Sequence, residues 1–81
     1  MTPLRARFLV TEIRHHHAWA GKTIVLEPLC DQTIPEGQRL MWATPEGRFE
    51  MSIDTPAANE CLVLGAKVYI DIANVKDVDV P

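Results

Sequence analysis

The 81-residue chain contains little of several residue types that mark common protein classes. Its two cysteines, Cys30 and Cys61, are too few for a disulfide framework. No apolar run reaches the roughly 18 residues that a membrane helix needs. The charged start over 1–6 leads into no apolar core, so no secretion signal is expected. The net charge of −3 lacks the basic surplus of a protein that coats duplex DNA. These absences favour a cytoplasmic protein with reduced, buried thiols.

The composition that is present is typical of one small globular domain spanning residues 1–81. Hydrophobic residues make up 47% of the chain and charged residues 23%. A chain of this length buries only about three-fifths of its unfolded surface. We therefore expect a single core and no separate catalytic domain.

Two segments alternate between apolar and polar residues with a period of two, which predicts half-buried strands. Residues 48–54 place Phe49, Met51 and Ile53 on one face. Residues 67–72 place Val68, Ile70 and Ile72 inward. Each segment leaves its other face to solvent.

Three further strands are predicted from β-branched and aromatic content over 5–14, 23–29 and 38–44. In the first, Leu9 and Ile13 lie opposite the other apolar residues. Apolar residues on both faces predict a strand that is buried twice or curves around a barrel.

Turn and helix signals complete the expected fold. Residues 44–47, Thr-Pro-Glu-Gly, predict a hairpin turn, and Gly65 predicts a turn into the last clear strand. Thr55 before Pro56 predicts the N-cap of one short helix. Residues 74–81 form either a sixth edge strand or a loose tail. The fold class is therefore all-β with one short helix: a five- to six-stranded antiparallel barrel or sandwich, OB-like or SH3-like in size.

Four segments, at 7–13, 23–29, 43–53 and 64–72, contain two strand patterns, a Thr-Pro-x-Gly turn and a Gly-x-x-x-Tyr strand. In this order and spacing they resemble a group of small, mostly uncharacterised bacteriophage and prophage proteins. The resemblance covers most of the chain but not the loop over 15–19. It implies origin in a phage-like genome and brings no catalytic signature.

Conspicuous single residues have a structural as well as a functional interpretation. Consecutive histidines, His15–His17, point in different directions, so a solvated loop is favoured over a metal site. No cofactor is expected. Trp42 is expected in the core, whereas Trp19 either covers the barrel end or stacks on a partner.

No nucleophile–base arrangement or phosphate loop is indicated, so we expect a protein that is not an enzyme.

Charge is unevenly distributed along the chain. Residues 50–81 hold six acids and two lysines, whereas residues 1–49 hold five acids and six basic residues. The leading hypothesis is a phage-type, anti-CRISPR-like inhibitor of a host protein complex, such as a nucleic-acid-binding defence complex, acting in the host cytoplasm. The partner-binding residues it predicts are acidic: Asp54, Glu60, Asp71, Asp77 and Asp79. An ordinary solvated surface is the structural alternative.

Two other functions stay open. A single-stranded nucleic-acid-binding protein would use basic and aromatic residues, namely Arg5, Arg7, Trp19, Lys67 and Tyr69. A virion structural or decoration protein is the third hypothesis. Edge strands are compatible with a homodimer in every case.

Overall fold

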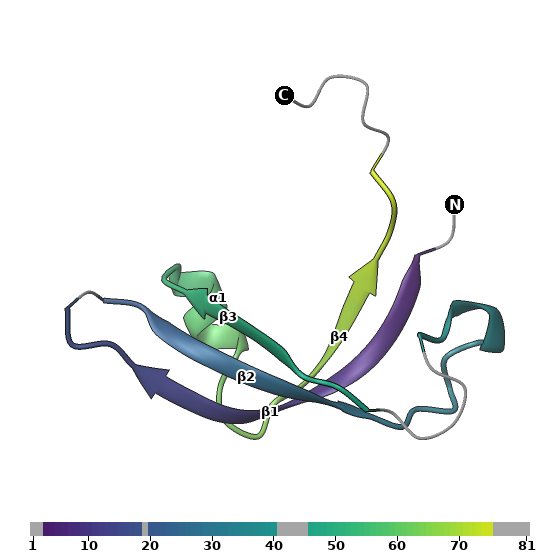
Figure 1. Cartoon of the computed structure of the whole chain (residues 1–81), viewed down its shortest axis with the longest axis horizontal. Helices are drawn as coiled ribbons and strands as arrows, with labels where there is room; N and C mark the ends of the chain where they lie inside the picture. The colour runs from purple at the N-terminus through teal and green to yellow at the C-terminus, as the bar shows by residue number, and fades with distance from the viewer. Residues whose placement is uncertain (1–2, 19, 41–45, 76–81) are drawn as a thin grey trace.

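The computed structural model describes residues 3–18, 20–40 and 46–75 of the chain. Its described elements are four strands, one α-helix and one 3-10 turn: β1 (Leu4–His15), β2 (Lys22–Leu29), η1 (Glu36–Gln38), β3 (Phe49–Ile53), α1 (Pro56–Cys61) and β4 (Lys67–Ile72). The strands form one antiparallel sheet in the order β3-β2-β1-β4. The sheet curls into a half-barrel, with β4 running across the direction of β2 and β3 (Figure 1).

The all-β class with one short helix is confirmed, but five to six strands were predicted and the described residues hold four. The missing strand was predicted over 38–44. The first residue of this segment belongs to η1, and the next, Arg39, forms an isolated bridge with Arg5. Residues 41–45 lie outside the described residues. The Arg39 guanidinium donates to the carbonyls of Ile34 and Gln32, at 2.8 and 3.1 Å. This local bonding replaces a strand ladder.

The tail contains no strand where it is described. Residues 73–75 are irregular, and residues 76–81 lie outside the described part of the chain. Residues 44 and 45 of the predicted hairpin turn over 44–47 also lie outside it. Gly65, in contrast, turns the chain into β4 with a φ of +85°, a left-handed conformation that favours glycine.

A β-bulge at Thr11 explains the apolar residues that β1 carries on both faces. Val10 pairs with Leu26, whereas Glu12 pairs with Val25, so Thr11 is an extra residue on β1. The alternation changes phase there, and Ile13 packs against the core beside the residues it was predicted to oppose. The prediction that Ile13 shares a face with Leu9 was therefore wrong.

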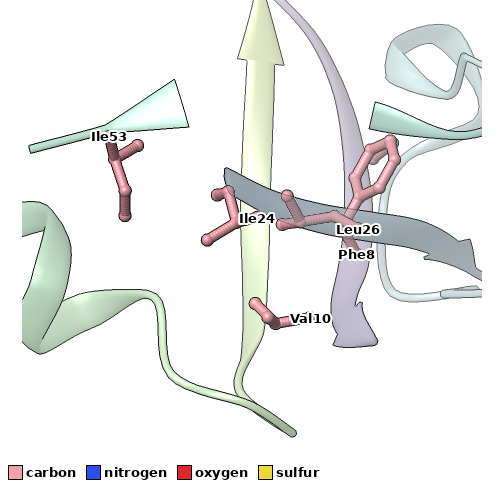
Figure 2. Packing of buried hydrophobic residues seen from close by; sticks show 6 residues of the cluster. Phe8, Val10, Ile24, Leu26 and Ile53 are labelled. Atoms are coloured by element: carbon pink, nitrogen blue, oxygen red, sulfur yellow. The ribbon is translucent and has the colours of Figure 1, made fainter. Parts of the chain in front are cut away.

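The core lies on the concave side of the half-barrel, which we call the inner face. Figure 2 shows side chains from β1, β2 and β3 converging there. The most deeply buried of them, each 1% exposed, are Val10, Ile24 and Leu26. The rings of Phe8 and Phe49 meet edge to face, with centroids 6.2 Å apart.

Helix α1 begins where its sequence predicts. The Thr55 hydroxyl accepts a hydrogen bond from the backbone N–H of Ala58 at 3.2 Å, and Pro56 occupies the first turn. Ala58 and Leu62 pack against the core cluster. Because the helix has six residues, it covers only part of the inner face.

Both cysteines are free thiols, but they are exposed rather than buried. Cys30 follows the last residue of β2, and Cys61 is the last residue of α1. The predicted burial was wrong because each thiol lies where its element ends. No helix in the described ranges is long and apolar enough to cross a membrane.

Candidate functional site: the outer face of the sheet

The convex side of the sheet, which we call the outer face, brings a basic and aromatic group together on β1 and β4. Arg5 lies opposite Asp71, Arg7 opposite Tyr69 and Leu9 opposite Lys67. Residues that lie opposite each other in a ladder project from the same face. We call the resulting group the Tyr69 cluster, and its members are Arg5, Arg7, Asp31, Thr33, Lys67, Tyr69 and Asp71.

The loop that follows β2 contributes Asp31, whose carboxylate accepts hydrogen bonds within this cluster. Asp31 Oδ1 accepts from the Thr33 backbone N–H at 2.9 Å and from the Thr33 hydroxyl at 2.5 Å. This side-chain-to-backbone turn fixes the carboxylate. Asp31 Oδ2 accepts from the Tyr69 hydroxyl at 2.9 Å. Hydrogen bonds from Thr33, then from Tyr69, hold the pKa of Asp31 below its ordinary value.

Arg5 is already occupied by two partners within the cluster. Its Nε and Nη2 donate to the two carboxylate oxygens of Asp71 at 2.7 and 3.0 Å. Its guanidinium carbon also lies 4.9 Å from the centroid of the Tyr69 ring. The hydrogen bond from Arg5 lowers the pKa of Asp71. The ring of Tyr69 is therefore held at its hydroxyl and along its surface.

Arg7 and Lys67 differ from Arg5, because neither forms an ion pair among the described residues. Both line a shallow, open hollow of about 300 Å³ that Asp31, Thr33 and Tyr69 also border. Tyr69 is 51% exposed there. The hollow therefore presents two available cations beside an oriented aromatic ring.

A second group of charges lies farther along the outer face, over Val25. Glu12 and Glu50 flank Val25 on the neighbouring strands. Arg14 bonds both acids, at 3.0 and 3.3 Å, and Arg48 bonds Glu50 at 2.7 Å. The hydrogen bond from Arg48 is the main cause of a lowered pKa at Glu50. Val25 is only 3% exposed beneath this network, which we call the charged cover.

A short polar chain continues along the same face. His16 Nε2 lies 2.7 Å from the Thr23 hydroxyl, which lies 3.2 Å from the Ser52 hydroxyl. No three His, Cys, Asp or Glu side chains in the described ranges are arranged to hold a metal ion. His16 thus makes a structural contact to β2.

The two sets of site residues predicted from sequence are placed differently. Of the nucleic-acid set, Arg5, Arg7, Lys67 and Tyr69 meet in the Tyr69 cluster, and Trp19 lies outside the described residues. Of the acidic set, Asp54 follows β3 and Glu60 lies in α1. Asp71 lies on the opposite edge strand, bound to Arg5. Asp77 and Asp79 lie outside the described residues.

Sequence reasoning missed Asp31 and Thr33. The available signal was the Asp-x-Thr spacing immediately after a predicted strand, which is typical of a side-chain-to-backbone turn. Tyr69, which donates to Asp31, is 38 residues away from it, and no local pattern reveals that contact. No protein-family profile, curated protein or solved structure matches the chain.

Proposed function

We propose that the protein is a non-enzymatic binding protein that holds a short single strand of nucleic acid against the Tyr69 cluster. The observation that carries this proposal is a pair of cations without an ion pair among the described residues, Arg7 and Lys67, which border one hollow with the half-exposed Tyr69. Single-strand binding combines cations that contact phosphates with an aromatic ring on which a base stacks.

The surroundings of Tyr69 suit stacking. Its hydroxyl is bound by Asp31 and its ring contacts the Arg5 guanidinium, so the ring is oriented before a ligand arrives. Binding of a base therefore costs little conformational entropy on the protein side of the contact. Arg7 and Lys67 line the same hollow as the ring, which is where the phosphates of a stacked nucleotide would lie.

The charge balance limits this interaction to a short footprint. Asp31 and Asp71 lie within the same cluster and repel further phosphates. With two phosphate contacts, the logarithm of the affinity falls with the logarithm of the salt concentration with a slope of about −1.4. Raising salt from about 50 to 200 mM would then weaken binding about sevenfold.

Fluorescence anisotropy with a labelled oligothymidine of about 12 nucleotides tests the proposal. Arg7→Ala and Lys67→Ala should each reduce the salt slope by about 0.7, and Tyr69→Leu should weaken binding without changing the slope. Arg48→Ala is the matched control, because it removes an exposed cation from the outer face outside the cluster. Absence of binding at low salt, or equal weakening by Arg48→Ala, would contradict the proposal.

A second candidate function is the phage-type inhibitor of a host nucleic-acid-binding complex. It is favoured by Asp54 and Glu60, which are exposed beside and within α1 and form no ion pair among the described residues. Two carboxylates without a cation partner could take the place of phosphates in a basic groove.

Co-purification with a tagged chain from host lysate, with and without nuclease, tests this candidate. A stoichiometric complex that survives nuclease and is lost in Asp54→Lys/Glu60→Lys would support it. Glu36→Lys is the matched control, since Glu36 is an exposed acid of η1. Retention of the complex by the double variant would exclude these acids as its binding residues.

A further inference from the structure

Strand β4 forms one edge of the described sheet and pairs only with β1. It contains no proline, and four of its six residues are β-branched or aromatic. Such an edge is able to pair with another strand unless its sequence prevents this. The backbone of β4 therefore offers a binding surface in addition to the side chains of the Tyr69 cluster.

The ladder with β1 indicates which backbone groups of β4 are available. Val10 N–H donates to the Ala66 carbonyl at 2.9 Å. In an antiparallel ladder the bonded residues alternate, so Val68 and Ile70 direct their backbone groups toward β1. The N–H and C=O groups of Lys67, Tyr69 and Asp71 consequently face the open side.

We propose that β4 pairs antiparallel with β4 of a second copy of this chain, about a two-fold axis at Tyr69. This register places Lys67 opposite the partner's Asp71, Asp71 opposite the partner's Lys67, and the two Tyr69 residues opposite each other. Opposite charges and aromatic pairs are the favourable cross-strand combinations. Lys67, which has no ion pair among the described residues, thereby gains one, and Asp71 shares its carboxylate between Arg5 and the partner's Lys67.

Exposed apolar residues near both ends of β4 fit the same arrangement. Val63 and Leu64 lie in the turn before the strand with 48% and 65% exposure, whereas Ile72 is its last residue with 50% and Val75 follows it with 77%. Antiparallel pairing about Tyr69 places Ile72 opposite the partner's Ala66, next to the turn that contains the partner's Val63 and Leu64. The dimer therefore brings together apolar side chains that the single chain leaves exposed.

Other arrangements of two copies are less favourable. Parallel pairing of β4 in register would place Lys67 against Lys67 and Asp71 against Asp71, which is destabilising. The opposite edge strand, β3, contains one charged residue, Glu50, so pairing two copies of β3 places no opposite charges across the interface. Residues beyond β3 lead into Thr55–Pro56 and α1, where the chain leaves the sheet.

Sedimentation equilibrium on the whole chain measures the proposed dimer directly. We expect the wild type to have twice the mass of 9.1 kDa at micromolar concentration. Lys67→Asp places two acids opposite each other at both ends of the interface, and Asp71→Lys places two lysines there. Each variant alone should raise the dissociation constant about tenfold or more.

An equimolar mixture of the two variants provides the decisive measurement. A Lys67→Asp strand against an Asp71→Lys strand restores opposite charges at both ends, so the mixture should again contain dimers. Arg48→Asp, immediately before β3, is the control and should leave the dimer unchanged, and circular dichroism verifies that each variant is folded. A monomeric wild type, or a mixture no more associated than its components, would overturn the proposal. Because the measurement is a mass without nucleic acid, it is independent of the proposed function.

Discussion

The two faces of the half-barrel bury apolar side chains by different means. On the inner face, Ile24 and Leu26 are covered by other apolar residues and by α1. On the outer face, Val25 lies between them in sequence and is nearly as buried, yet its cover consists of charged side chains. The long stems of Arg and Glu exclude water from Val25 while their charged ends pair in solvent.

This difference shows that the central strand of a small sheet can be buried on both sides without a second apolar layer. β2 has five consecutive buried residues, Lys22 to Leu26, although only its inner face packs on the core. The inner face should therefore contribute most of the stability. The outer face should contribute less to the free energy of unfolding, and its contribution should depend on the polarity of its residues, on pH and on salt.

Insertion of one alanine after Thr11 should have the largest effect, because it shifts every later residue of β1 by one position against β2. The shift would move Glu12 to the inner face and Ile13 to the outer face. We expect loss of the cooperative unfolding transition in thermal denaturation followed by circular dichroism. Insertion of one alanine after His17, in the connection between β1 and β2, is the control and should preserve the transition. A native-like midpoint with the alanine after Thr11 would show that the pairing of β1 with β2 tolerates a second extra residue.

Truncation of one leucine on each face should have the second-largest effect and compares how much each face contributes to stability. Leu26→Ala removes a side chain that is 1% exposed in the core, and should lower the free energy of unfolding by about 2–4 kcal/mol. Leu9→Ala removes the same atoms from a half-buried position on the outer face and should cost about 1 kcal/mol or less. Urea titration of both variants measures the difference. Equal losses would mean that the two faces contribute similarly.

Local sequence patterns predicted much of this fold. Alternation over 67–72 matches β4, and the strand predicted over 48–54 exceeds β3 by one residue at each end. The Thr55–Pro56 signal gave α1 because a helix cap depends on neighbouring residues. The bulge was not predictable, since an extra residue in β1 is defined only by its pairing with β2, about 14 residues away.

The candidate site could be predicted only in part. Alternation placed Lys67 and Tyr69 on one face, but it did not reveal that Arg5 is bound to Asp71, 66 residues away. Asp71 was therefore assigned to a partner surface although it has a partner within the sheet. Contacts across strands depend on register, and register depends on turns and bulges that the sequence specifies weakly.

Substitution of Val25 tests whether the charged cover truly excludes water. Val25→Thr conserves shape but places a hydroxyl under the cover, so we expect a loss of about 1–2 kcal/mol in the free energy of unfolding. Val63→Thr is the matched control at a residue that is 48% exposed, and should change stability by about 0.5 kcal/mol or less. If Val25→Thr were as neutral as its control, water would already reach Val25 through the cover.

Acidification should have the smallest effect and should act on the outer face alone. Hydrogen bonds lower the folded-state pKa of Asp31, Glu50 and Asp71, chiefly those from Thr33, Arg48 and Arg5. A lowered folded-state pKa contributes stability above the pKa of the unfolded chain, and this contribution is lost as pH falls through the folded value. The free energy of unfolding should therefore decrease as pH falls below about 4.5, where free carboxylates begin to protonate.

The decrease separates the two faces, because the buried core cluster contains no titratable side chain. The variant Asp31→Asn/Glu50→Gln/Asp71→Asn should be less stable at pH 7 and should lose less on acidification, whereas Leu26→Ala should keep the wild-type dependence on pH. High salt should flatten the wild-type profile, since these groups are exposed and their ion pairs are screened. A pH profile of the triple variant identical to that of the wild type would assign the acid sensitivity to other groups.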